Sequence, residues 1–265
     1  MKKQTGVTLI EIMISLLIGL IVISATIGIY VTAIRGSTDT LRSARLNYDL
    51  DSAMQLMMND IRRAGYWGGA VAGANSQINP FTAATTNAQI LTVNTTNDCI
   101  LYTYDANGSG VLTPAVFTDD VDANEYYGFR RSTIAGNRGI IEMRLTGTTT
   151  ANCADGVWQA LSINDNSGEQ LDITRLEFSF NAIAAAGTVP ALPATSKCLN
   201  TASLAAPSNT LCANATVGYL VTGQRALETR QVNIVITGVV ANDAAVTKTI
   251  TNSVKIRNDR VFTQP

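Results

Sequence analysis

One uninterrupted apolar run near the N-terminus dominates the hydrophobic pattern of the chain. Residues 6–34 read GVTLIEIMISLLIGLIVISATIGIYVTAI, and the twenty-three residues from Ile12 to Ile34 carry no charge. About 20 apolar residues suffice to cross a bilayer as a helix, so we expect a transmembrane helix over 7–34. Only residues 1–6, with two lysines, precede it. The positive-inside tendency predicts that they stay cytoplasmic while the C-terminal bulk is exported.

A second hydrophobic pattern with helical spacing follows the apolar run. Apolar residues recur every three or four positions between Leu46 and Ala64, and no proline occurs before Pro80. This spacing predicts that the helix continues as an amphipathic segment over 35–65, which docks on a head domain. We expect it to end near Ala64, with Gly65 as its C-cap.

Beyond the helix the pattern changes to alternation with a period of two, which is typical of half-buried strands. We predict strands at 90–93, 100–104, 126–131, 140–145, 157–163 and 171–180, and a closing hairpin of 231–240 and 246–256 joined across 241–244. The predicted fold class is therefore α+β, with a long N-terminal helix packed on a mainly antiparallel head that spans 66–265. Residues 182–215, rich in Ala, Thr, Ser and Pro, are predicted to form one long loop that either binds a partner or is mobile.

Composition narrows the functions that this head can have. The 265 residues carry a net charge of −1, so no basic field attracts nucleic acid, and they include no histidine. Without histidine, the chain cannot form a His-based catalytic triad or the usual His-containing zinc sites. Because GxSxG and metal-ligand motifs are also absent, we expect no enzymatic activity and no cofactor.

Four cysteines, Cys99, Cys153, Cys198 and Cys212, all follow the apolar run. An even number on the exported side suits two disulfides in an oxidising periplasm. Three pairings are open. We favour Cys99 with Cys153 and Cys198 with Cys212, because the second pair closes a short loop at modest entropic cost.

One carboxylate, Glu11, lies at the leading edge of the apolar run. An acidic residue in a spanning segment costs about 2.5–3.5 kcal/mol on insertion scales, so it needs a partner or a function. The alternative is a glutamate that reaches the lipid headgroups from the membrane edge.

The residues Gly6-Val7-Thr8-Leu9-Ile10-Glu11 resemble the class III leader of type IV pilins and type II secretion pseudopilins. The resemblance implies that a prepilin peptidase cleaves after Gly6 and that Val7 becomes the N-methylated first residue, where the family usually has Phe. It also implies that Glu11 acts in assembly, by pairing with the Val7 α-amine of a neighbouring subunit. A plain signal anchor with an accidental glycine is the alternative.

A second, shorter resemblance concerns residues 62–68, RRAGYWG, which are similar to the same segment of PilW-type minor pilins. It implies a minor pilin in the initiation or tip complex of a type IV pilus, anchored in the inner membrane with a periplasmic head and later part of the pilus. The implied partners are other minor pilins, the major pilin, prepilin peptidase and the inner-membrane assembly platform. A J-type minor pseudopilin and a tip adhesin remain open, and a membrane-anchored enzyme is disfavoured.

One loop imitates the start of a calcium-binding loop. Asp105, Asn107 and Ser109 alternate with small residues, but the twelfth position is Val116, where a bidentate glutamate is needed. We therefore expect a polar turn and no metal there.

Overall fold

The computed structural model describes residues 6–68, 78–82, 91–113, 124–134, 137–161, 171–185, 187, 189–203, 206–216, 218–240 and 243–264. Parts of several sequence predictions lie outside these residues: leader residues 1–5, Ile90, Val116, residues 162–163 and turn residues 241–242. The chain divides into two compact units, residues 1–45 and residues 46–265.

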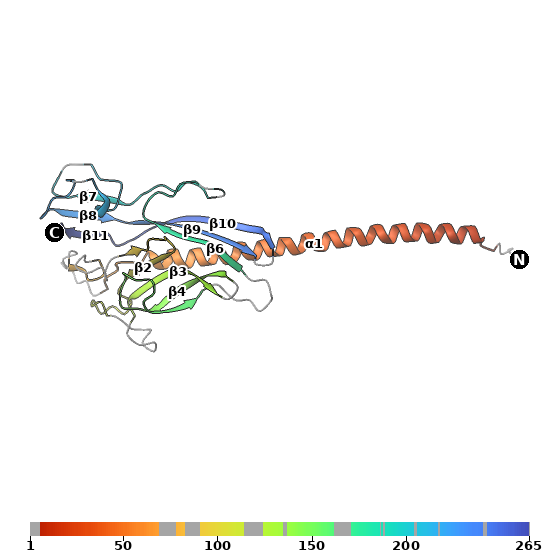
Figure 1. Ribbon diagram of the computed structural model, residues 1–265, viewed down its shortest axis with the longest axis horizontal. Helices are drawn as coiled ribbons and strands as arrows, with labels where there is room; N and C mark the ends of the chain where they lie inside the picture. The colour runs from red at the N-terminus through yellow and green to blue at the C-terminus, as the bar shows by residue number, and fades with distance from the viewer. Residues whose placement is uncertain are drawn as a thin grey trace. The chain divides into compact units, whose positions relative to one another are not determined.

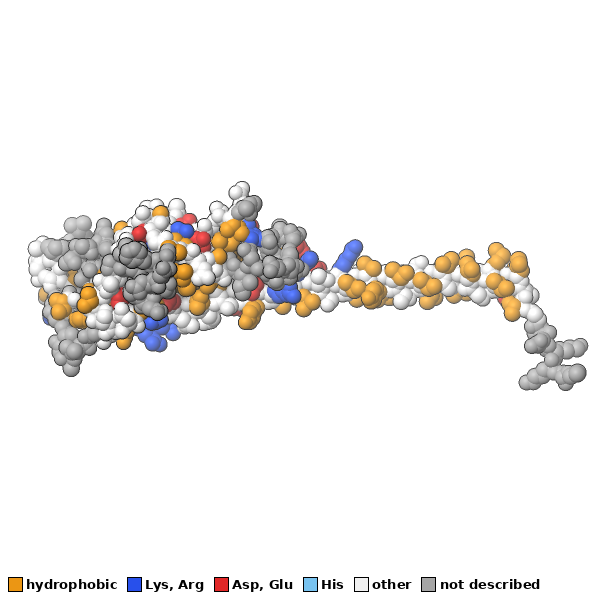
Figure 2. Space-filling model, turned by 90° about the horizontal axis from the view of Figure 1, so that it is seen from below, with side chains coloured by type: hydrophobic (Ala, Val, Ile, Leu, Met, Phe, Trp, Pro, Cys, Tyr) orange, Lys and Arg blue, Asp and Glu red, His pale blue; other side chains and the backbone are white. Residues whose placement is uncertain are grey.

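A single helix, α1 (Leu9–Ile61), begins in the first unit and ends in the second. In the first unit its apolar side chains are exposed, and Figure 2 shows them along this stretch of the helix. Among the described residues, α1 is the one helix long and apolar enough to cross a membrane, judged by length and composition. It runs without a break through Gly19 and Gly28.

The described residues of the second unit form three antiparallel sheets. The largest has the strand order β1-β2-β3-β4-β5, as Figure 1 shows for β2, β3 and β4. Its strands are β1 (Thr92–Val93), β2 (Cys99–Thr103), β3 (Tyr126–Ile134), β4 (Arg138–Thr146) and β5 (Val157–Ala160). The structure thus confirms the five strands predicted between residues 90 and 163, with shifted ends.

The second sheet has the order β10-β9-β6. Its strands are β6 (Leu171–Ser179), β9 (Gln231–Val240) and β10 (Asp243–Lys255). The alternating pattern at 171–180 and the closing hairpin are confirmed. The register of β10 on β9 shifts between Asp243 and Thr247 and is regular from Thr247 to Lys255.

The third sheet, with the order β11-β8-β7, was not predicted. Its strands are β7 (Lys197–Asn200), β8 (Arg225–Thr229) and β11 (Arg260–Thr263). The prediction of one long loop over 182–215 is therefore wrong, since β7 and a short 3-10 helix, η4 (Cys212–Asn214), lie within it. The physical reason is that four- or five-residue strands show too few alternations to stand out from irregular chain.

The hydrophobic core lies between α1 and the first two sheets. The helix contributes Leu46, Leu50, Met54, Met57, Met58 and Ile61, all buried. Ile100 and Phe129 of the first sheet and Ile234 and Ile236 of the second pack in the same cluster. The amphipathic pattern that begins at Leu46 is therefore the side of α1 that holds the head together.

The helix ends three residues before the predicted position. Arg63 and Ala64 donate their N–H groups to carbonyls three residues back, so the last turn is tighter than an α-helix. Gly65 has φ +74°, the left-handed conformation expected of a C-cap glycine. Asn258 completes the cap, since its Nδ2 donates to the carbonyls of Arg63 (3.3 Å) and Ala64 (3.1 Å).

Candidate functional site

The N-terminus of α1 carries three reciprocal hydrogen bonds between Thr8 and Glu11. The backbone N–H of Thr8 donates to Glu11 Oε2 at 2.9 Å, and the Thr8 hydroxyl donates to the same oxygen at 3.0 Å. In return, the Glu11 N–H donates to Thr8 Oγ1 at 3.3 Å. This is a capping box, which satisfies N–H groups that the first helical turn leaves without partners.

The sequence analysis missed this role of Glu11, although its signal was readable. Thr8-Leu9-Ile10-Glu11 has the T-x-x-E spacing of a capping box ahead of an apolar run. The carboxylate therefore has a partner within its own chain as well as the intermolecular one that the resemblance implies. The two hydrogen bonds that the Glu11 carboxylate accepts both go to Oε2. Among the described residues, Oε1 accepts no hydrogen bond.

Gly6 and Val7 precede the helix in chain without regular secondary structure. A Cβ added at Gly6 would meet nothing within 4 Å among the described residues, and Gly6 is not among the glycines with positive φ. The local structure therefore does not require glycine at this position. Val7 is 71% exposed, as an end released by cleavage would need to be.

A buried tyrosine cluster fastens α1 to the largest sheet. Asp60 of the helix accepts hydrogen bonds from the hydroxyl of Tyr102 (2.5 Å) and from that of Tyr104 (2.9 Å). The Tyr104 ring stacks on Tyr127, with centroids 4.0 Å apart, and the Arg63 guanidinium lies 4.2 Å from the Tyr104 centroid. Burial, followed by the Asp60 charge, raises the pKa of Tyr102 well above its ordinary value, so its hydroxyl stays a donor.

Two disulfides brace the head at separate places. The structure joins Cys99 to Cys153 in the region of the largest sheet and Cys198 to Cys212 in the third sheet, the same pairs that the sequence analysis favours. Cys198 is fully buried and belongs to a small cluster with Cys212 and Ala226. The second disulfide thus ties β7 to η4 and gives residues 182–215 a fixed anchor.

The calcium-like loop is arranged around a buried carboxylate. Asp105 Oδ2 accepts the N–H groups of Gly68 and Gly110, each at 2.9 Å, so it braces a turn. Glu125 lies close enough to interact with Asp105, and burial raises the pKa of Glu125. Within the described residues, no group of three or more His, Cys, Asp or Glu side chains is placed to hold a metal.

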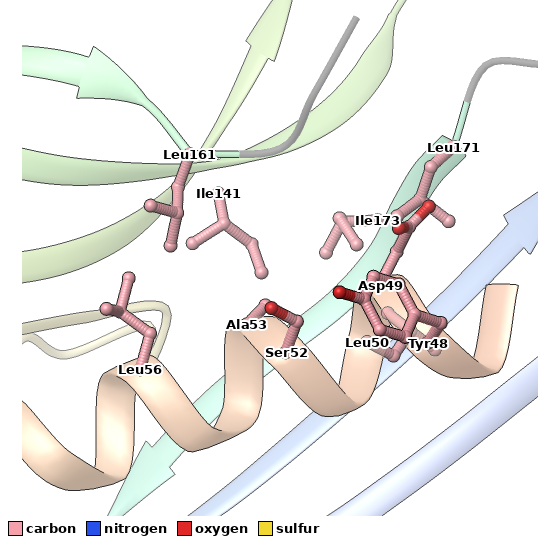
Figure 3. Close-up of a pocket in the computed structure, with 10 residues that line it drawn as sticks. All are labelled: Tyr48, Asp49, Leu50, Ser52, Ala53, Leu56, Ile141, Leu161, Leu171 and Ile173. Carbon is pink, nitrogen blue, oxygen red and sulfur yellow. The ribbon is translucent and has the colours of Figure 1, made fainter. Parts of the chain in front are cut away.

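An apolar hollow of about 240 Å³ lies between α1 and strands β4 and β6. Figure 3 shows Leu56 and Ala53 of the helix facing Leu161 and Ile141, with Tyr48 at the other end. Leu161 borders residues 162–170, which the structure does not describe. The lining is largely aliphatic, and its titratable side chains are Tyr48 and Asp49 of the helix.

Comparisons with known proteins give matches for the N-terminal segment and for the head. The profile described as prepilin peptidase-dependent protein B matches residues 39–256, which is more than half of the chain. The profile of the prokaryotic N-terminal methylation motif matches residues 1–27. A search of curated proteins finds no significant match, and a search of solved structures finds none either.

Proposed function

Because the chain belongs to the prepilin peptidase-dependent protein B family, we propose that it is a minor pilin that helps to start or cap a type IV pilus. Its pilin- or pseudopilin-type role follows from the family and from the N-terminal methylation motif. The finer assignment adds the resemblance of residues 62–68 to PilW-type minor pilins. In this proposal, prepilin peptidase cleaves after Gly6, and α1 anchors the subunit in the inner membrane with the head in the periplasm.

The single observation that carries the proposal is the position of Glu11 on an exposed apolar helix. When such helices gather in a filament, the carboxylate enters an apolar surrounding, where an unpaired charge is costly. The capping box supplies two hydrogen bonds to Oε2 but no positive charge. The α-amine of a neighbour's Val7 supplies that charge, since its reference pKa of about 7.7–8.0 keeps it mostly cationic.

The head supports an assembly role through its construction. The core shared with the first two sheets and the Asp60–tyrosine cluster hold the end of α1 in one place, and two disulfides brace the head. A rigid head on a polymerising helix can make selective contacts with other minor pilins and with the major pilin. Catalysis is no part of this role.

The test compares Glu11→Gln with the wild type in membrane and sheared-pilus fractions of the native cell, with leader cleavage confirmed in each. Gln keeps the size and the capping acceptor but removes the charge. We expect unchanged membrane levels and a fall of about tenfold or more in the pilus fraction, since each 1.4 kcal/mol of lost pairing is worth about tenfold. Ser15→Ala is the matched control, because it removes an exposed hydroxyl that donates to the Glu11 backbone carbonyl and leaves the Glu11 carboxylate intact.

Two outcomes contradict the proposal in different ways. Equal amounts of Glu11→Gln and wild type in both fractions would show that Glu11 does not pair during assembly. Wild-type protein absent from pili but present with secretion-system components would identify a minor pseudopilin instead.

A further inference from the structure

Strand β10 forms one outer edge of the second sheet. The strand order is β10-β9-β6, and Figure 1 shows β10 on the far side of β9 from β6. From Thr247 to Lys255 it pairs with β9 in nine consecutive, regular positions. This stretch contains no proline and no glycine. It is therefore a long, regularly paired edge, of the kind that can accept another strand.

The opposite edge of the same sheet is closed by the rest of the head. The N–H of Phe178 in β6 donates to the carbonyl of Asn97 at 2.7 Å. Arg131 Nε donates to the carbonyl of Ile173 at 2.6 Å. Among the described residues no further strand lies beside β10, so the two edges differ.

The side of β10 that points away from β9 can be read from its hydrogen bonds. The N–H of Ser253 donates to the side chain of Asn252 at 2.8 Å. In an antiparallel pair, alternate residues direct both backbone groups away from the partner. The residues in step with Ser253, including Thr251 and Thr247, therefore present their N–H and C=O groups to the outside.

From this edge we infer that β10 takes up an acidic strand of another pilin-like subunit, which joins the sheet by antiparallel β-augmentation. The inference rests on the proposed function, because that function places pilin-like subunits beside this chain. Outward backbone groups of Thr247 and Thr251 would provide the contact, and side chains would choose the partner.

Charge selects the partner and rejects a second copy of this chain. Lys248 and Lys255 are exposed at the edge, and residues 247–255 contain no Asp or Glu. If two copies paired through β10, the seam would hold four lysines and no carboxylate from residues 247–255 of either strand, so no complementary charge pair could form there. A strand that carries Asp or Glu opposite these two lysines meets the same edge with complementary charge.

The experiment places a photo-reactive amino acid at the exposed Thr247 of the full-length chain in its native cell. Val221, exposed in the region of the third sheet, is the control position. We expect irradiation to link Thr247 to another chain that carries the N-terminal methylation motif, through a segment with Asp or Glu, and we expect no such product from Val221. A product with a second copy of this chain, a product with a protein lacking the motif, or none above the Val221 level would overturn the inference.

Two substitutions at Thr251 test whether the partner is held by backbone hydrogen bonds. Thr251→Pro removes an outward N–H, and Thr251→Val is its matched control. We expect Thr251→Pro to lower the Thr247 product by about tenfold, because one lost hydrogen bond changes an equilibrium by about that order. We expect Thr251→Val to leave the product unchanged. Formation of both disulfides reports whether the Pro variant folds.

The paired change Lys248→Glu with Lys255→Glu leaves the backbone intact, so it tests the charge argument even if Thr251→Pro fails to fold. We expect it also to lower the Thr247 product by about tenfold, since like charges would then face each other. An unchanged product in the double Glu variant would overturn the choice of an acidic partner. A normal pilus content without the Thr247 product refutes this inference alone, whereas the product without pilus incorporation refutes the proposed function alone.

Discussion

Replacing Tyr102 by Phe should weaken the attachment of α1 to the head by a measurable amount. The ring is fully buried, and its hydroxyl lies 2.5 Å from Asp60 Oδ2. Phe keeps the ring and removes only the donor. A hydrogen bond to a charged group contributes about 1.5–3 kcal/mol.

The expected size of the effect follows from what remains around Asp60. Tyr104 still bonds Oδ1 at 2.9 Å, and Arg63 lies 3.7 Å from the carboxylate. The Asp60 side chain is 18% exposed, so water can replace part of the lost bond. We therefore expect a loss near the middle of the range, about 2 kcal/mol in the free energy of unfolding. For a domain of 150–250 residues this corresponds to a fall in Tm of about 4–8 °C.

The assay is urea unfolding of the full-length protein in detergent, followed by near-ultraviolet circular dichroism. Tyr66→Phe is the matched control, because Tyr66 is 47% exposed, and its loss should stay within about 0.5 kcal/mol. Combining Tyr102→Phe with Asp60→Asn in a double-mutant cycle isolates the pair. A Tyr102→Phe loss no larger than that of the control, or additive effects in the cycle, would refute the role given to this cluster.

Two further predictions concern the head. The double variant Cys198→Ser with Cys212→Ser should lower the free energy of unfolding by about 3 kcal/mol, the chain-entropy value for a loop of about 15 residues. Urea unfolding measures this loss. Peptide mapping that linked Cys99 to Cys198 would contradict the pairing. Burial raises the pKa of Glu125 above its ordinary 4.5, so its contribution to stability is present below that value and is lost as the pH rises through the folded-state pKa. Glu125→Gln should therefore gain stability relative to the wild type as the pH rises from about 4.5 to about 7, and a difference that is the same at both pH values would contradict this.

Sequence patterns predicted the long elements of this fold well, because long elements repeat their signal many times. The apolar run and the spacing of three and four residues after Leu46 each repeat over several turns, and the 53 residues of α1 follow both without a break. Residues 171–180 alternate often enough to identify β6. By contrast, β7 and β11 have four residues each and depend on long-range pairing with β8, which no local pattern records.

The candidate site shows the same division between local and distant signals. Gly6, Val7 and Glu11 are neighbours in sequence, so their motif could be recognised directly, and the T-x-x-E capping box could have been as well. The cap of α1 depends on Asn258, which is 194 residues from Ala64. The pairing of Asp60 with Tyr102 likewise spans 42 residues. Contacts of this kind arise from the sheet topology and could not be inferred from spacing.

The central claim is that this chain is processed as a pilin at Gly6, and the intact mass of the mature protein tests it most directly. The protein extracted from native membranes should begin at Val7 and carry one N-methyl group. Gly6→Ala should leave the leader attached, although the structure places no steric demand on that residue. A mature wild-type chain that begins at Met1, or at a residue well beyond the apolar run, would contradict the account.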